Sequence, residues 1–252
     1  MTQTALIFGG SGKVSRQITR LLTSASPPWA VHSIIRSQHQ SGSLQSLGAL
    51  PIVQCIEDSS VSDLAKTIRS VKPDVVIWSA GAGGGDPSRT DTVDRKGAIK
   101  SMDATAEAGV SRYIIVSALD VRDREGKGVP EWYNDDDKAR SDRVWGAIGA
   151  YMKAKLDADT ELVKGNEKRK LKYTIVRPGQ LTEDVGKGKV AAGKIHLGTP
   201  IAREDVARVV IECIENDGTI GMAFDVVGGD QDIKEAVEGV VSGKQDTFEG
   251  YH

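Results

Sequence analysis

Short runs of apolar residues alternate along this chain with longer segments that are typical of helices. Most of the short runs are rich in β-branched residues, as expected of strands buried on both faces of a parallel sheet. We expect strands at residues 5–8, 31–35, 52–55, 75–78, 113–116, 173–176 and 223–227. Helices are expected at residues 14–23, 61–71, 95–108 and 139–165. This alternation predicts an α/β fold, a doubly wound parallel sheet with right-handed crossovers.

Three segments lack this pattern. Residues 120–138 form an acidic, polar insertion, and residues 185–198 are rich in Gly and Lys. Both are expected as loops at the rim of the sheet. The final residues, 243–252, are polar, and we expect them to be poorly ordered.

Composition bounds the class of protein. The 252 residues lie within the range of one large α/β domain, so we expect residues 1–252 to form a single domain. No apolar run approaches the ~20 residues of a membrane-spanning helix. The first residues show no charged region followed by an apolar segment, so no signal peptide is expected. We therefore expect a cytoplasmic protein with no membrane partner. The net charge of -2 favours no nucleic-acid partner, and no metal-ligand spacing occurs, so no metal is expected.

A glycine cluster separates the first expected strand from the first expected helix. Such a turn directs unpaired N–H groups at a ligand, which suits the pyrophosphate of a dinucleotide. Gly10 and Gly12 fit the start of G-x-G-x-x-G, whereas Gly9 and Gly12 fit the related G-x-x-G spacing. Ser15 replaces the third glycine in both registers. The alternative is a glycine turn without a ligand. The residues expected to contact a cofactor here are Gly9, Ser11, Gly12, Lys13 and Val14.

The end of the second strand selects between the two nicotinamide dinucleotides. A carboxylate there binds the ribose 2′-hydroxyl of NAD, whereas an arginine binds the 2′-phosphate of NADP. Arg36 stands at this position, and Lys13 offers a second positive charge, so we expect NADP(H). A solvated surface arginine is the alternative. After the third strand, Asp58 is a candidate for bonding the adenine amino group, although an acidic turn with Glu57 explains the pair almost as well.

The fourth strand ends in small residues. Ser79, Ala80 and Gly81 follow it, and glycines continue through Gly84 and Gly85. Ligand sites of doubly wound folds lie at this edge of the sheet. We expect the first three residues to contact the cofactor, with a flexible glycine loop as the alternative.

A Tyr-x-x-x-Lys pattern is formed by Tyr151 and Lys155. Residues four apart share one face of a helix. A nearby cation lowers the pKa of a phenol, and such a tyrosine can exchange a proton with a substrate while a hydride moves. The lysine can also hold the nicotinamide ribose. Lys155 is therefore both a catalytic and a cofactor-binding candidate.

Together these motifs resemble the short-chain dehydrogenases/reductases, and more narrowly their atypical NAD(P)H-binding branch, which includes NmrA-like and flavin-reductase-like proteins. The resemblance covers residues 4–230 and rests on the glycine loop and residues 79–81, 93–97, 113–117, 151–155, 177–179 and 203–207. It implies a Rossmann core with a small C-terminal substrate region, at about residues 180–252. It also implies that Pro178 borders the nicotinamide pocket.

The chain departs from that family's pattern at several positions. One register places Leu119 where a substrate-polarising serine or threonine is expected, and another brings Ser117 into the site, so Ser117 is kept as a catalytic candidate. Asp94 stands where many relatives carry an Asn that supports a proton-relay water. The insertion carries Trp132 and Tyr133, which either cover a substrate or pack the insertion onto the domain.

Of three functions considered, we expect the first, and the other two remain open as alternatives. The first is an NADP(H)-dependent oxidoreductase acting on a small organic carbonyl or alcohol. The second, motivated by Leu119, is a non-catalytic NADP(H)-binding regulator. The third is an epimerase or dehydratase that retains its cofactor. A small-molecule substrate is the expected partner, and the chain is expected to be a monomer or a homodimer.

Overall fold

A mostly parallel sheet forms the centre of the protein. The computed structural model describes residues 2–83 and 88–252, so Gly84 and Gly85 lie outside the described residues. Within these residues the main sheet has the order β11-β8-β10-β6-β5-β4-β1-β2-β3. All neighbouring strands pair in parallel except β8, which is antiparallel to β10 and β11. The strand order reverses between β1 and β4, which confirms the predicted Rossmann-type α/β fold.

The elements have the following bounds. The strands are β1 (Thr4–Phe8), β2 (Ala30–Ile35), β3 (Leu50–Val53), β4 (Val75–Trp78), β5 (Arg112–Val116), β6 (Lys172–Pro178), β7 (Leu181–Thr182), β8 (Lys189–Ala192), β9 (Ile201–Ala202), β10 (Met222–Gly228) and β11 (Gln231–Asp232). The α-helices are α1 (Lys13–Thr23), α2 (Ser41–Gln45), α3 (Val61–Val71), α4 (Ala98–Glu107), α5 (Arg124–Lys127), α6 (Asp135–Lys164), α7 (Asn166–Arg169), α8 (Arg203–Glu215) and α9 (Ile233–Ser242). Shorter turns are η1 (Gln38–Gln40), η3 (Asp217–Thr219) and the π-helical η2 (Thr90–Gly97).

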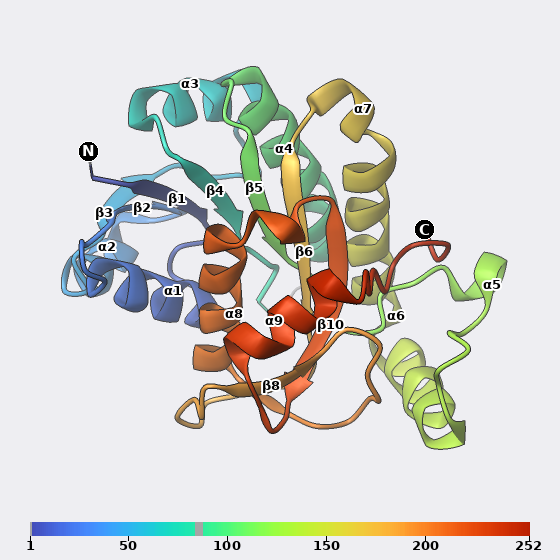
Figure 1. Cartoon of the computed structure of the whole chain (residues 1–252). Coiled ribbons are helices and arrows are strands. Elements are labelled where there is room, and N and C mark those ends of the chain that lie inside the picture. Colours follow the sequence, from blue (N-terminus) through green and yellow to red (C-terminus); the bar gives the residue numbers. More distant parts are fainter. Residues whose placement is uncertain (1, 84–87) are drawn as a thin grey trace.

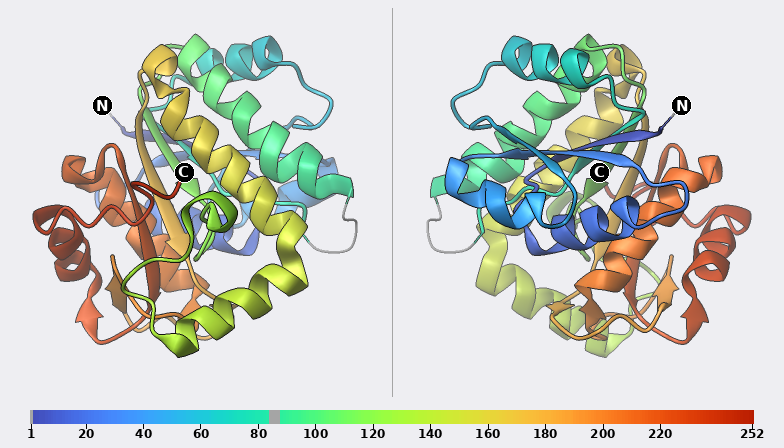
Figure 2. Two further views of the ribbon diagram at one scale, coloured as in Figure 1. Left: turned by 90° about the vertical axis from the view of Figure 1, so that its right-hand side faces the viewer. Right: turned by 90° about the vertical axis from the view of Figure 1, so that its left-hand side faces the viewer.

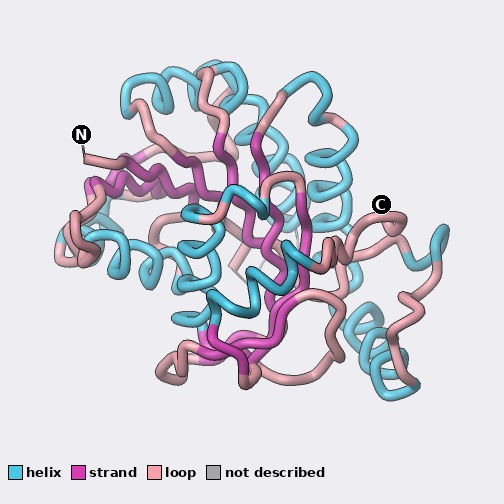
Figure 3. The backbone as a smooth tube through the Cα atoms, viewed as in Figure 1, coloured by secondary structure: helices cyan, strands magenta, loops and turns pink. Residues whose placement is uncertain are grey.

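Helices cover both faces of the sheet (Figures 1 and 3). One apolar cluster joins α1, α8 and α9 to one face, and a second joins α3, α4 and α6 to the other. Strands β4 and β5 are buried along their whole length because they lie between these layers. This burial accounts for the continuous apolar runs in the sequence, since both faces of a central strand contact helices.

Helix α6 begins earlier than the apolar pattern predicts. The Asn134 side chain accepts a hydrogen bond from the Asp137 N–H, and the Asp137 carboxylate accepts one from the Asn134 N–H. This capping box starts the helix at Asp135 within the segment expected to be a loop. The helix is also kinked at Ile148, where φ is -131° and ψ is 33°. Figure 2 shows its first half turning away from the second half.

Other predictions need correction. The expected loop at residues 185–198 contains β8, and helices α8 and α9 were not predicted, although both bury one face against the sheet. The final residues are not poorly ordered. Phe248 is only 1% exposed and lies under the Arg177 guanidinium, 4.9 Å from its ring centre, while the Thr247 N–H donates to the Ala223 carbonyl at 2.8 Å. In the described part of the chain, no helix is both long and apolar enough to cross a membrane.

Candidate cofactor and active site

The glycine loop after β1 is built by close backbone contacts. Gly9 has φ +77°, and a Cβ atom there would lie 2.5 Å from Ala80 Cα, so this position requires glycine. Ser15 Oγ donates to the Gly9 carbonyl at 2.8 Å, which binds the first turn of α1 to the loop. Gly12 is the N-cap of α1, and no side chain among the described residues caps that turn. The first turn of α1 therefore presents backbone donors at the loop.

A cavity of about 280 Å³ lies at the carboxyl ends of β1, β2 and β4. The predicted cofactor-binding residues that line it are Gly9, Ser11, Gly12, Arg36, Ser79, Ala80 and Gly81. They come from three separate segments of the sequence, which the parallel sheet brings to one edge. The cavity therefore lies at the reversal of strand order, where dinucleotides bind in this fold.

Five predicted cofactor residues do not line this cavity: Pro178 lines a second cavity, Lys155 lines neither, and the other three lie elsewhere. Lys13 is exposed and its Nζ pairs with Glu183 Oε1 at 2.6 Å. Val14 is buried in the core, and Asp58 is exposed outside the cavity wall. Among the two acidic residues after β3, it is Glu57 that lines the cavity.

The wall beyond β2 and β3 contains polar pairs that the sequence did not indicate. Arg89 Nη2 lies 2.9 Å from Glu57 Oε2, and this hydrogen-bonded partner holds the pKa of Glu57 below its ordinary value. Gln40 Nε2 donates to Ser11 Oγ at 2.7 Å and thereby joins η1 to the glycine loop. Arg36 is exposed at the end of β2. Its guanidinium is thus available at the predicted 2′-phosphate position.

A second cavity, of about 420 Å³, lies beyond the carboxyl ends of β5 and β6. Of the predicted site residues it is lined by Ser117, Tyr151 and Pro178. Apolar walls come from the loop after β5, helix α6, β7 and the loop between β8 and β9. Their residues are Leu119, Val144, Ile148, Met152, Leu181 and Leu197. Leu119 and Ser117 both line the cavity, so the two registers considered for the serine place a residue in the same space.

Lys155 lies beneath the cavity in a buried polar group. Its Nζ is 3.4 Å from Asp94 Oδ1, 3.4 Å from the Val116 carbonyl and 5.8 Å from the ring centre of Tyr151. Burial acts to lower the pKa of Lys155, but its interactions with Tyr151 and Asp94 outweigh burial and raise it. Lys155 is therefore held as a cation, and Asp94 serves as its counter-ion.

The pKa of Tyr151 does not follow the expected direction. Burial raises the pKa of this phenol, and the nearby Lys155 cation only partly offsets the effect. The expected effect of Lys155 is present, since this cation acts to lower the pKa of Tyr151, but desolvation of the phenolate dominates and the net shift is upward. Tyr151 is consequently held in its protonated form.

Asp159 is a site residue that the sequence analysis missed. Its Oδ2 accepts a hydrogen bond of 2.5 Å from Ser117 Oγ, and its side chain is completely buried on α6. Burial raises the pKa of Asp159 to about 6 despite the attraction of Arg177. Asp159 follows Lys155 by four residues, just as Lys155 follows Tyr151. That spacing on one helix face was the available signal.

The insertion after β5 packs onto the protein. Tyr133 is 3% exposed, receives a hydrogen bond from Arg122 Nη1 at 2.8 Å and donates one to Asp120 Oδ1 at 2.9 Å. Trp132 contacts Tyr133 and Tyr251 edge to face, with ring centres 6.0 and 5.9 Å apart. Neither aromatic residue lines the larger cavity.

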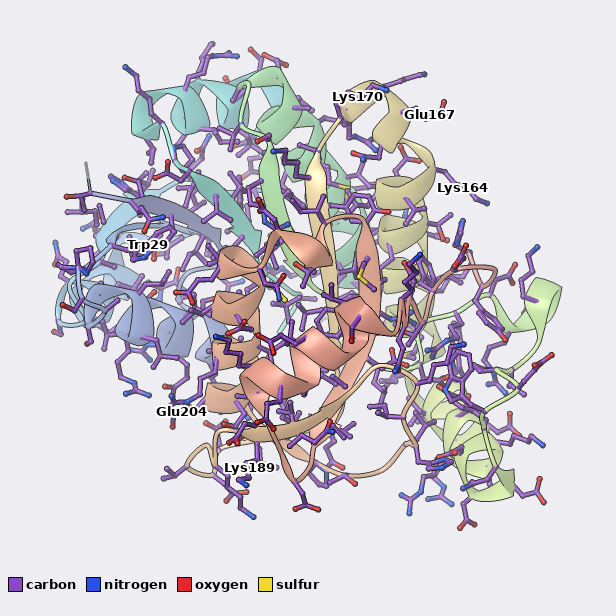
Figure 4. The ribbon with its side chains drawn as sticks, in the orientation of Figure 1. Trp29, Lys164, Glu167, Lys170, Lys189 and Glu204 are labelled. Atoms are coloured by element: carbon purple, nitrogen blue, oxygen red, sulfur yellow. The ribbon has the colours of Figure 1, made fainter. Side chains whose placement is uncertain are left out.

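Charges elsewhere on the molecule lie apart from these cavities. Figure 4 shows the labelled Lys164, Glu167 and Lys170 around α7, at the end of α6 remote from its kinked half. The labelled Glu204 lies in the first turn of α8, where its Oε1 pairs with Arg20 at 2.9 Å. Within the described residues, no group of His, Cys, Asp and Glu side chains could hold a metal ion.

Comparison with known proteins places these features in a family. A family model described as NAD(P)H-binding matches residues 9–217. A UPF0659 protein of Schizosaccharomyces pombe is 36% identical over 94% of this chain and 94% of its own length. The uncharacterized sugar epimerase YhfK of Bacillus subtilis is 32% identical over 92% of this chain and 97% of its own length. A solved structure from Bacillus halodurans, described as a candidate NAD-dependent epimerase/dehydratase, is 29% identical with a TM-score of 0.76, covering 94% of this chain and 99% of that chain.

Proposed function

This chain belongs to the NAD(P)H-binding family of atypical short-chain dehydrogenases/reductases, and on that premise we propose that it is an NADP(H)-dependent oxidoreductase acting on a small organic carbonyl or alcohol. One observation carries the proposal. Tyr151 and Ser117 line one cavity, and the buried Lys155 cation lies 5.8 Å from the tyrosine ring. A proton donor and a second hydroxyl thus face the same space, as carbonyl reduction requires.

The residues of the smaller cavity fit a nicotinamide dinucleotide. Gly9 and Gly12 have no side chains, so a ligand can come close to the backbone there, and the first turn of α1 is uncapped. Both features suit a pyrophosphate. Gly9, Ser11, Gly12 and residues 79–81 would hold the phosphates and ribose, while Arg36 would hold a 2′-phosphate. When bound, such a cofactor supplies or accepts the hydride.

Tyr151 is the proposed proton donor to the substrate oxygen. Its raised pKa keeps the phenol protonated before the reaction. As the proton leaves, the negative charge develops beside the Lys155 cation, which stabilises the phenolate electrostatically. Lys155 therefore favours the proton transfer by stabilising the phenolate that the transfer produces.

Ser117 is proposed to orient the substrate oxygen under the control of Asp159. With Asp159 ionised, the serine proton is directed at the carboxylate. A protonated Asp159 can instead donate to Ser117 Oγ, which frees the serine proton for the substrate. Because the pKa of Asp159 is raised to about 6, this exchange would occur near pH 6.

A screen of carbonyl compounds for NADPH consumption tests the proposed reaction. The expected result is turnover of at least one carbonyl substrate that is lost in Tyr151→Phe. Consumption of NADPH by both proteins at equal rates would reject Tyr151 as the proton donor. Cofactor binding without turnover of any carbonyl or alcohol would instead support the regulator.

The names of two relatives favour an epimerase or dehydratase as the second candidate. Such an enzyme regenerates its cofactor in each cycle, so it produces no net change in nicotinamide absorbance. It also predicts nucleotide that remains bound through purification. Mass spectrometry of the denatured protein's supernatant, combined with the absorbance assay, distinguishes this candidate from the oxidoreductase.

A further inference from the structure

The outer wall of the larger cavity carries two arginines that have no partner among residues 2–83 and 88–252. Arg140 and Arg143 line the cavity from the first half of α6. In the part of the chain that the structure describes, neither guanidinium forms an ion pair or a hydrogen bond. By contrast, Arg124 on the neighbouring insertion pairs with Asp142. Two cations beside an apolar space are therefore left available to a ligand.

The Arg140 side chain has a defined position against the opposite wall. Gly198 has φ +111°, and a Cβ atom built on it would lie 2.9 Å from Arg140 Cζ and 3.0 Å from Nε. The guanidinium thus lies across the backbone of Gly198, in space that a side chain would occupy. Both residues line the cavity, so this contact keeps the cation at its wall.

Acidic groups near the cavity are already engaged. Asp120 lines the cavity, but its carboxylate accepts hydrogen bonds from Tyr133 at 2.9 Å and Ser141 at 2.5 Å. Asp137 is bound to His196 Nδ1 at 2.6 Å and to the Leu197 N–H at 2.6 Å. Neither carboxylate is paired with Arg140 or Arg143, so the wall retains its positive charge.

Aliphatic side chains accompany the two cations. Val144 is 39% exposed and Ile148 is 47% exposed, and both line the cavity. They come from the segment that the kink at Ile148 turns away from the rest of α6. Apolar surface next to unpaired guanidinium groups is complementary to a ligand with an apolar body and an anionic head.

We infer that the larger cavity binds an amphipathic organic anion, a carboxylate or a phosphate, whose negative head is held by Arg140 and Arg143. The inference rests on the proposed function for the position of the reacting group, which would lie at Tyr151, another residue that lines the cavity. The arginines precede Tyr151 by eight and eleven residues. That separation is roughly 12–16 Å along a straight helix, and the kink alters it. A medium-length apolar body spans this distance.

Calorimetric titration with octanoate, octyl phosphate and octanol tests the inference on the full chain, with and without NADP+. Wild-type protein is expected to bind at least one of the two anions about tenfold or more tightly than octanol, because charge-assisted hydrogen bonds to arginine are strong. The double variant Arg140→Gln/Arg143→Gln is expected to lose that preference and to bind octanol as before. Tighter binding of octyl phosphate than octanoate would assign the head group to the phosphates, and the reverse would assign it to the carboxylates.

Lys138→Gln is the matched control, since it removes a cation from the same helix outside the cavity wall. Equal binding of octanol and both anions by wild type would overturn the inference. An undiminished anion preference in the double variant, or an equal loss in Lys138→Gln, would overturn it too. The titrations need no turnover, so a failed carbonyl screen leaves their outcome intact. The titrations without NADP+ test the anion preference even if the protein does not bind this nucleotide.

Discussion

The two cavities along the sheet edge are built in different ways. The smaller one is formed by the ends of β1, β2 and β4, and its polar groups are linked to one another, as in Arg89 with Glu57 and Gln40 with Ser11. The larger one has mainly apolar walls and contains Arg140 and Arg143, which have no ion-pair or hydrogen-bond partner in the described part of the chain. The smaller cavity suits one fixed type of ligand, the dinucleotide. The larger cavity is shaped by the insertion, the kinked α6 and residues after β6, where substrate specificity can vary.

Replacing Tyr151 tests whether the larger cavity is where the chemistry occurs, and this change should give the largest effect. Tyr151→Phe removes the proposed proton donor, so turnover should fall by about 10²–10⁴-fold. NADPH affinity should remain, because the smaller cavity is untouched. Steady-state kinetics and calorimetry measure the two quantities. Tyr173→Phe, a change on β6 outside both cavities, is the control, and an equal loss in that variant would contradict the assignment.

Asp159 links the larger cavity to stability. Its pKa is raised from 3.8 to about 6, so the folded state binds a proton that the unfolded state releases. Stability should therefore fall as pH rises from about 4 through about 6, by up to roughly 3 kcal/mol. Asp159→Asn should abolish this loss and be the more stable protein at about pH 7. Urea unfolding across this pH range measures the effect.

The control for that experiment is Asp157→Asn, a half-buried position on the same helix whose carboxylate pairs with Lys153 at 2.6 Å. Its pH dependence should match that of wild type. An unchanged pH dependence in Asp159→Asn would show that the buried carboxyl is not the group responsible. The pH–rate profile of Asp159→Asn separates two roles of Asp159. A purely structural role would leave the pH dependence of turnover unchanged, whereas the proposed control of Ser117 would alter it.

Gly9→Ala probes the smaller cavity. Both Gly9 and Gly109 have φ +77°, but a Cβ at Gly9 would meet Ala80 at 2.5 Å, whereas none of the described atoms lies within 4 Å of a Cβ at Gly109. Gly109→Ala thus measures the backbone strain alone. Gly9→Ala should cost about 1–3 kcal/mol more, because the loop and Ala80 must move apart. Equal unfolding free energies for the two variants would disprove the tight contact.

Arg36→Ala should have the smallest effect, confined to one cofactor. Loss of the contact to a 2′-phosphate should weaken NADPH binding about tenfold and leave NADH binding nearly unchanged. Arg16→Ala removes an arginine of α1 that does not line the cavity and serves as the control. Equal weakening of both cofactors in Arg36→Ala would remove the phosphate-binding role.

The residues of the smaller cavity were more predictable from the sequence than those of the larger cavity. Residues 9–14 and 79–81 are contiguous motifs with local conformational requirements, so most of their positions could be inferred. Asp58 was assigned in place of Glu57 because a turn's orientation is not encoded by spacing. The contact of Arg140 with Gly198 and the bond of Ser117 to Asp159 join distant segments. Such contacts depend on how the sheet and the kinked helix bring these residues together.

The most direct test of the central claim is a calorimetric titration of the nucleotide-stripped protein with NADPH and with NADH. The account predicts that both cofactors fit the glycine loop and that NADPH binds about tenfold or more tightly, through Arg36. The account would be contradicted if neither cofactor bound, or if NADH bound more tightly than NADPH.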